Sequence, residues 1–109
     1  MPELLGAALA GKDFYLPSGQ KCSPTAWAEA IEGGVDIVGT EMIDVDGVPA
    51  RVFTRFAGVD HDGTGTIWEL GVTGSKYGGH HELYRTRAEA EAGHATVAGN
   101  LTAGKAPDG

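Results

Sequence analysis

Residues 35–59 have the sequence VDIVGTEMIDVDGVPARVFTRFAGV, and this stretch decides the predicted fold because it has the pattern of a β-hairpin. Two runs rich in β-branched and aromatic residues flank Asp46-Gly47, a dipeptide that favours a type I′ turn because both positions tolerate positive φ. If these two residues form the loop, the numbers of paired residues sum to 93, as 46 and 47 do. The sequence therefore predicts two antiparallel strands in a defined register.

That register predicts which side chains share a face of the hairpin. One face has Ile37, Gly39, Glu41 and Ile43 opposite Phe56, Thr54, Val52 and Ala50; the other has Val38, Thr40 and Met42 opposite Arg55, Phe53 and Arg51. We expect the first face to form the core side, with Glu41 as a polar residue on it.

Two helices and two further strands are predicted around the hairpin. Strands are expected over 12–16 and 66–73. A helix is expected over 24–32, since Ser23 is a good N-cap and Pro24 suits the first turn. A second helix is expected over 87–101, where Thr86 and Glu89 have the spacing of a capping box. Its apolar stripe follows the helical period and comprises Ala90, His94, Val97, Ala98 and Leu101.

The resulting order, β-α-β-β-β-α, predicts the α+β class, with one small domain built on an antiparallel β-sheet and two helices on one face of it. The domain is expected over residues 13–103. Residues 1–12 are expected to form an N-terminal extension, and residues 104–109 a flexible tail.

Charge and cysteine content argue against several classes of function. Eight Lys and Arg against 15 Asp and Glu give a net charge of −7, so neither nucleic acid nor an anionic membrane surface is an expected partner. No apolar run approaches the roughly 20 residues of a membrane span. The single cysteine excludes an internal disulfide and favours a reducing compartment.

Without its first strand, the element order is also that of double-stranded RNA-binding domains. That module needs basic residues at the start of its last helix to contact phosphates. Here the corresponding residues 86–91 are TRAEAE, with two acids and one base, so the RNA-binding interpretation is rejected.

Three motifs occur in series along the chain. Gly58-Val59-Asp60-His61 ends a strand, Trp68-Glu69 opens a strand that Gly74 closes, and residues 84–94 follow the pattern Tyr-x-Thr-x-x-Glu-Ala-x-x-Gly-His. Together with Trp27 on the first helix, they resemble a group of small uncharacterised proteins encoded by bacteriophages and other mobile elements. The resemblance covers residues 13–101. It departs at Phe53 and Arg55, where the group has small or aliphatic residues, and at 70–73, where the group has Thr-Met-Val-Phe. It implies an origin and brings no activity with it.

The polar residues of these motifs are candidates for a ligand or acid/base site, and they comprise Asp60, His61, Glu69, Tyr84 and His94. Packing of the second helix on the sheet is expected to bring His94 near Glu69 or Thr54. The alternative to a functional site is a buried structural network in which Glu69 or Glu41 accepts a hydrogen bond from His94 and Asp60 caps turn amides. The structural interpretation is preferred for His94, because a lone histidine on an apolar helix face is usually a satisfied core residue. No catalytic residue is predicted.

No metal or other cofactor is predicted either. Residues 80–82 (HHE) and 60–62 (DHD) offer imidazole and carboxylate ligands, but no His-x-x-x-His pair occurs, and neighbouring histidines point apart in an extended chain.

A second candidate is a binding surface on the face of the hairpin away from the core. Arg51, Phe53 and Arg55 alternate along one strand, and Trp68 is expected to lie on the same face, with Val38, Met42, Leu70 and Val72. An uncovered face with this many apolar groups usually binds a partner.

These observations favour a non-enzymatic phage or mobile-element accessory protein that acts in the host cytoplasm through protein–protein contact. The expected partner is a host factor, another phage protein or a second copy of the chain. Two alternatives remain open: a capsid or tail component of the virion, and a small metal-dependent or acid/base enzyme using His61, Glu69 and His94.

Overall fold

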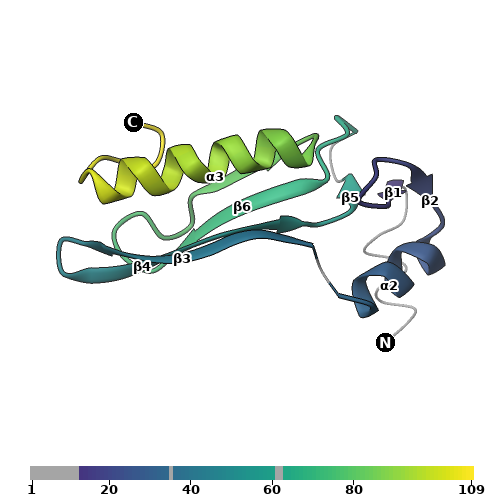
Figure 1. The fold of residues 1–109 in the computed structure, drawn as a ribbon, viewed down its shortest axis with the longest axis horizontal. Coiled ribbons are helices and arrows are strands. Elements are labelled where there is room, and N and C mark those ends of the chain that lie inside the picture. The colour runs from purple at the N-terminus through teal and green to yellow at the C-terminus, as the bar shows by residue number, and fades with distance from the viewer. Residues whose placement is uncertain (1–12, 35, 61–62) are drawn as a thin grey trace.

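The computed structural model describes residues 13–34, 36–60 and 63–109, and the strands among them form two antiparallel sheets. The larger sheet has the order β3-β4-β6-β7, with strands Ile37–Val45, Val48–Phe56, Trp68–Thr73 and His81–Tyr84. The predicted N-terminal extension at 1–12 and the candidate residue His61 lie outside the described residues. Figure 1 shows the larger sheet running along most of the molecule.

The β3–β4 hairpin has the predicted register over most of its length. Gly39 pairs with Thr54 and Val45 with Val48, so paired positions sum to 93 from the turn as far as Gly39. Asp46 and Gly47 both have positive φ, as a type I′ turn requires. Beyond Gly39 the register shifts by one residue, and Ile37 pairs with Arg55 instead of Phe56. This bulge places Val38 against the core and exposes Ile37, the reverse of the prediction.

Helix α3 (Arg87–Thr102) covers one face of the larger sheet (Figure 1). Its buried residues are the five that the helical period predicts: Ala90, His94, Val97, Ala98 and Leu101. The last helical turns pack on Val52, Leu70 and Val72, which alternate along β4 and β6. The core therefore lies between a single helix and one face of the sheet.

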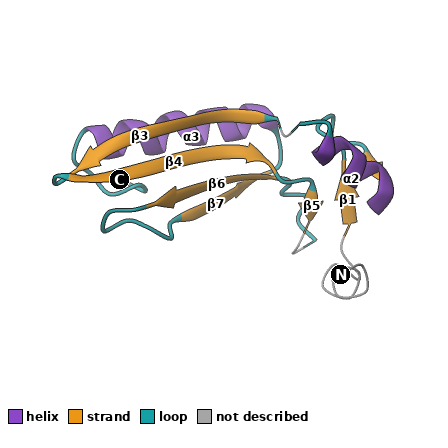
Figure 2. Cartoon of the chain, turned by 90° about the horizontal axis from the view of Figure 1, so that it is seen from below, coloured by secondary structure: helices purple, strands orange, loops and turns teal. Residues whose placement is uncertain are grey.

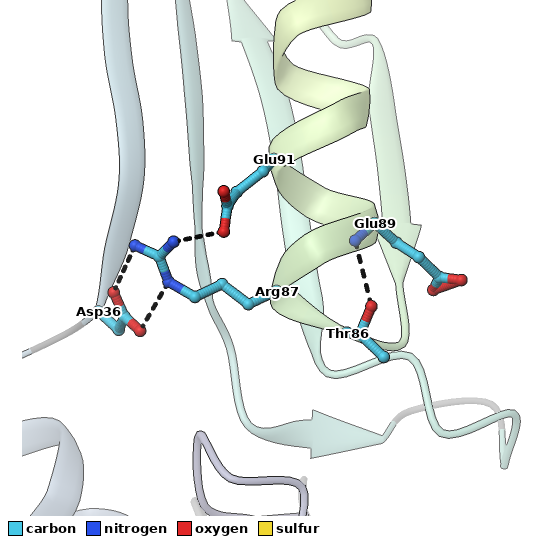
Figure 3. Close-up of polar contacts among 5 residues, drawn as sticks. All are labelled: Asp36, Thr86, Arg87, Glu89 and Glu91. Carbon is cyan, nitrogen blue, oxygen red and sulfur yellow. Dashed lines mark hydrogen bonds and ion pairs between the residues drawn. The ribbon is translucent and has the colours of Figure 1, made fainter.

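The start of α3 is fixed by a cap and by an ion-pair cluster (Figure 3). The Glu89 amide donates to Thr86 Oγ1, and the Glu89 carboxylate accepts from the amide of Arg85. Arg87 donates through Nε and Nη2 to the two carboxylate oxygens of Asp36, and through Nη1 to Glu91. These bonds tie the helix start to the residue that precedes β3.

The second helix packs elsewhere. Helix α2 (Pro24–Glu32) begins at the predicted N-cap Ser23, whose hydroxyl accepts from the Ala26 amide. It lies beside a small sheet of order β2-β1-β5, with strands Lys21–Cys22, Asp13–Tyr15 and Val59–Asp60. In Figures 1 and 2 this group occupies one end of the molecule. Trp27 packs on Phe14 and donates to the carbonyl of Ala57, which fixes α2 there and not over the larger sheet.

The predicted class is confirmed, since the described residues form an α+β fold of antiparallel strands and two helices. The finer prediction of one sheet is wrong, because the strands divide between two. Strands β2 and β7 were not predicted, and β5 was expected only as the end of a strand over 48–59. Neither described helix is long and apolar enough to cross a membrane.

Residues 104–109 turn back onto the end of α3. The Lys105 amide donates to the carbonyl of Asn100, and the Asn100 side chain donates to the carbonyl of Pro107. The flexibility of this tail stays a prediction.

Candidate functional site

The face of the larger sheet opposite α3 is covered by no described element (Figure 2). We call it the open face, and define it by three rows of cross-strand neighbours. The first is Met42, Arg51 and Thr73; the second is Thr40, Phe53, Gly71 and His81; the third is Ile37, Arg55, Glu69 and Leu83. The alternation of β4 thus places the predicted trio Arg51, Phe53 and Arg55 on one uncovered surface.

Large apolar side chains are unusually accessible on this face. Ile37, Met42 and Leu83 keep 57%, 64% and 39% of their surface exposed. The Phe53 ring lies across Gly71 on the neighbouring strand, where a Cβ atom would overlap it. A shallow depression of about 240 Å³ beside the ring is lined by Ile37, Thr40, Arg51, Phe53, Thr54 and Arg55.

The charges of the open face are arranged around Phe53. Arg55 lies with its guanidinium carbon 5.7 Å from the ring centre and donates through Nε to Glu69 at 2.8 Å. The other oxygen of Glu69 lies 3.4 Å from Nε2 of His81. Arg51 forms no hydrogen bond or ion pair with any described residue. The Arg55 guanidinium is therefore partly engaged by Glu69, whereas the Arg51 guanidinium is free to bind an anion.

The prediction that Trp68 belongs to this surface is wrong. Trp68 pairs with Phe56 and is 1% exposed, packed with Phe56 and Ala90 beneath α3. Leu70 and Val72 are buried on the same side. The physical reason is register, because β6 pairs with β4 so that its even-numbered residues face the helix. Glu69, expected with His94, lies on the open face instead.

His94 is the centre of a buried polar contact on the helix side. Its Nδ1 lies 2.7 Å from Thr54 Oγ1, and its Nε2 lies 2.9 Å from a carboxylate oxygen of Glu41. Gly39 makes room for the ring, since a Cβ there would lie 2.7 Å from Nε2. Glu41 was one of the two acids predicted to bond His94 in a structural network, and Thr54 was predicted to lie near His94.

The order carboxylate–imidazole–hydroxyl is that of a nucleophilic triad, but the burial of the hydroxyl opposes catalysis. Thr54 is 0% exposed and His94 is 7% exposed, so the hydroxyl has no surface at which a substrate would reach it. Glu69 lies across the sheet from His94, and these two therefore do not share an acid/base site. The arrangement can hold α3 in register on the sheet.

Asp60 is likewise engaged in local structure. Its two carboxylate oxygens accept from the backbone amides of Thr64 and Gly65, 3.1 and 2.9 Å away. This is the turn-capping role expected in the structural interpretation.

Tyr84 belongs to a polar chain along β7. Its hydroxyl donates to Glu82 Oε1, and the other oxygen of Glu82 lies 2.5 Å from Nε2 of His80. The phenol also lies against Gly93 of α3, where a Cβ would overlap it. Burial, followed by the bond to Glu82, raises the pKa of the Tyr84 phenol above its ordinary value. Neither Glu82 nor His80 was singled out as a partner of Tyr84 from the sequence, because β7 was not predicted.

A consequence for alkaline stability follows from the raised pKa of Tyr84. The folded state holds this proton more tightly than the unfolded state, so the contribution to stability is complete below about pH 10 and declines as the pH rises above it. We expect Tyr84→Phe to flatten the fall in unfolding free energy at alkaline pH. It should also remove the most alkaline component of tyrosine ionisation, followed by absorbance at pH values above 10. An unchanged titration curve would contradict the assignment.

Among residues 13–34, 36–60 and 63–109, no three His, Cys, Asp or Glu side chains gather in a way that would hold a metal ion. Comparisons with protein-family models, with curated proteins and with solved structures found no match to the chain. The site must therefore be interpreted from its own chemistry.

Proposed function

We propose that this chain is a non-enzymatic accessory protein that acts by binding another protein through its open face. The observation that carries the proposal is the exposure of Ile37, Met42 and Leu83 around Phe53, on a sheet whose other face is already covered by a helix. Burying apolar surface of this kind on a partner is favourable by roughly 25 cal/mol per Å². Side chains that merely fill the fold would be expected on the α3 side.

The proposed setting is a bacteriophage or another mobile element, with the protein acting in the host cytoplasm. The sequence motifs at 58–61, 68–74 and 84–94 support this part of the proposal. The partner would then be a host factor or another protein encoded by the same element.

Photo-crosslinking in the cells that encode the chain tests the binding face. A benzophenone amino acid replaces Met42 on the open face, and a matched control replaces Thr96, which is exposed on α3. We expect a discrete adduct from position 42 only, lost when Phe53→Ser is added. Equal crosslinking from both positions, or none from position 42, would count against the proposal.

Mass spectrometry of purified particles tests the place of action. An accessory protein of the host cytoplasm should be absent from them. Presence at a fixed copy number would instead assign the chain to the virion.

A further inference from the structure

We infer that the partner presents an extended acidic segment to the open face, with two carboxylates separated by three residues and a large apolar side chain midway between them. This inference rests on the proposed function and names the chemistry of the partner. It is carried by the placement of Arg51, Phe53 and Arg55 at alternate positions of one strand.

The spacing of the two arginines sets the spacing of the carboxylates. Residues 51 and 55 are four apart in β4, so their Cα atoms are separated by roughly 13 Å at about 3.3 Å per residue. An extended peptide lying along β4 has the same repeat, so acids at its first and fifth positions meet both guanidinium groups. Arg51 has no anion among the described residues, and Arg55 has further N–H groups besides the Nε that Glu69 engages.

The apolar position follows from Phe53. Its ring lies between the two arginines and beside the depression of about 240 Å³ that Ile37 and Thr40 also line. The third side chain of the extended segment falls on this ring. A depression of this size accepts one large side chain, whereas a helix about 10 Å in diameter does not enter it.

Charge favours an acidic segment over a nucleic acid and over a second copy of the chain. The chain has a net charge of −7, so the phosphate backbone of a nucleic acid is repelled except at these two arginines. A second copy docked face to face would bring its own Arg51 and Arg55 towards the same layer, and like charges there oppose association. A short acidic segment carries few charges and needs only Arg51, which has no partner among the described residues, and the N–H groups of Arg55 that Glu69 leaves open; acidic groups of the chain more than about 8 Å away are largely screened.

The test is a titration of the isotopically labelled protein with two capped peptides of one composition, followed by backbone amide shifts. The first, Gly-Glu-Ser-Phe-Ser-Glu-Gly, has the inferred spacing; the second, Gly-Glu-Glu-Phe-Ser-Ser-Gly, has adjacent acids. We expect saturable shifts over β3, β4, β6 and β7 with the first peptide, and at least threefold weaker binding of the second. Arg51→Gln with Arg55→Gln should weaken the first peptide about tenfold, as expected when two exposed charge pairs are lost. Arg85→Gln, which removes an exposed cation outside the open face, should leave binding unchanged.

Several results would overturn the inference: equal binding of the two peptides, shifts centred on α3, or no saturation at low-millimolar peptide. Tighter binding of an oligothymidylate, lost in the Arg51→Gln variant, would assign the face to single-stranded nucleic acid. Concentration-dependent shifts of the same amides without peptide would assign it to a second copy. If position 42 crosslinks a partner in cells while these peptides fail, the inferred chemistry is wrong and the proposed binding function stands.

Discussion

Replacing His94 with alanine is expected to lower the free energy of unfolding by about 3 kcal/mol, because the change leaves a cavity and removes the partner of a buried hydroxyl. Thr54 is fully buried, and its Oγ1 bonds His94 Nδ1 at 2.7 Å. Glu41 loses less, since its side chain is half exposed and reaches water. Urea unfolding measured by circular dichroism gives the difference directly.

His81→Ala is the matched control, because His81 is an exposed histidine on the opposite face of the sheet. A change within about 0.5 kcal/mol is expected there. Thr54→Val combined with His94→Ala should cost less than the sum of the two single changes, since each removes the same bond. If the His94→Ala variant has the same free energy of unfolding as the wild type, the contact with Thr54 contributes nothing and the structural interpretation of His94 fails.

The His94 contact shows how much of the candidate site can be predicted from local sequence patterns. The stripe of α3 follows from the helical period, and the position of Glu41 on the core side follows from the turn at Asp46-Gly47, which sets the register. Two local signals thus place His94 and Glu41 on facing surfaces. The choice between Glu41 and Glu69 as partner needs the pairing of β6 with β4, which neither signal contains.

The misplacement of Trp68 has the same physical origin. A strand has the same alternation whichever face is buried, so only its register against a neighbour distinguishes the two. Residues 57–67 separate β4 from β6 and include the short strand β5, so this connection is too long to set the register in the way that a two-residue turn does. The error at Ile37 arises differently, because the bulge at Val38 reverses the alternation where the hairpin meets the rest of the fold.

The open face was predictable on the hairpin strands β3 and β4, where Thr40 and Met42 lie opposite Phe53 and Arg51 as predicted. Arg51, Phe53 and Arg55 alternate within β4 and follow from the hairpin alone. His81 and Leu83 join them through β7, a four-residue strand that follows a glycine-rich connection and lacks a clear apolar pattern. Its pairing with β6 comes from tertiary packing, which is why Tyr84 was a candidate without its partner Glu82.

Gly93→Ala is expected to destabilise the protein by about 2 kcal/mol, although the same change in a helix interior usually stabilises by up to about 1 kcal/mol. A Cβ at Gly93 would overlap the hydroxyl and ring carbons of Tyr84. The ring is held by its bond to Glu82 and by packing against both core clusters, so it cannot move aside without loss. The expected result is a lower midpoint of urea unfolding.

Gly99→Ala on the same helix provides the control, because beyond its chain neighbours and the adjacent helix backbone no atom lies within 4 Å of the position its Cβ would take. It should stabilise the protein by about 0.5–1 kcal/mol, so the two substitutions are expected to have opposite signs. The state of Tyr84 in Gly93→Ala reports how the overlap is relieved. If the ring swings out to solvent, its alkaline titration returns towards that of an ordinary tyrosine; if α3 moves instead, the raised pKa of Tyr84 persists while stability falls. A stabilised Gly93→Ala variant with an unchanged Tyr84 titration would show that α3 does not lie against Tyr84 at this position.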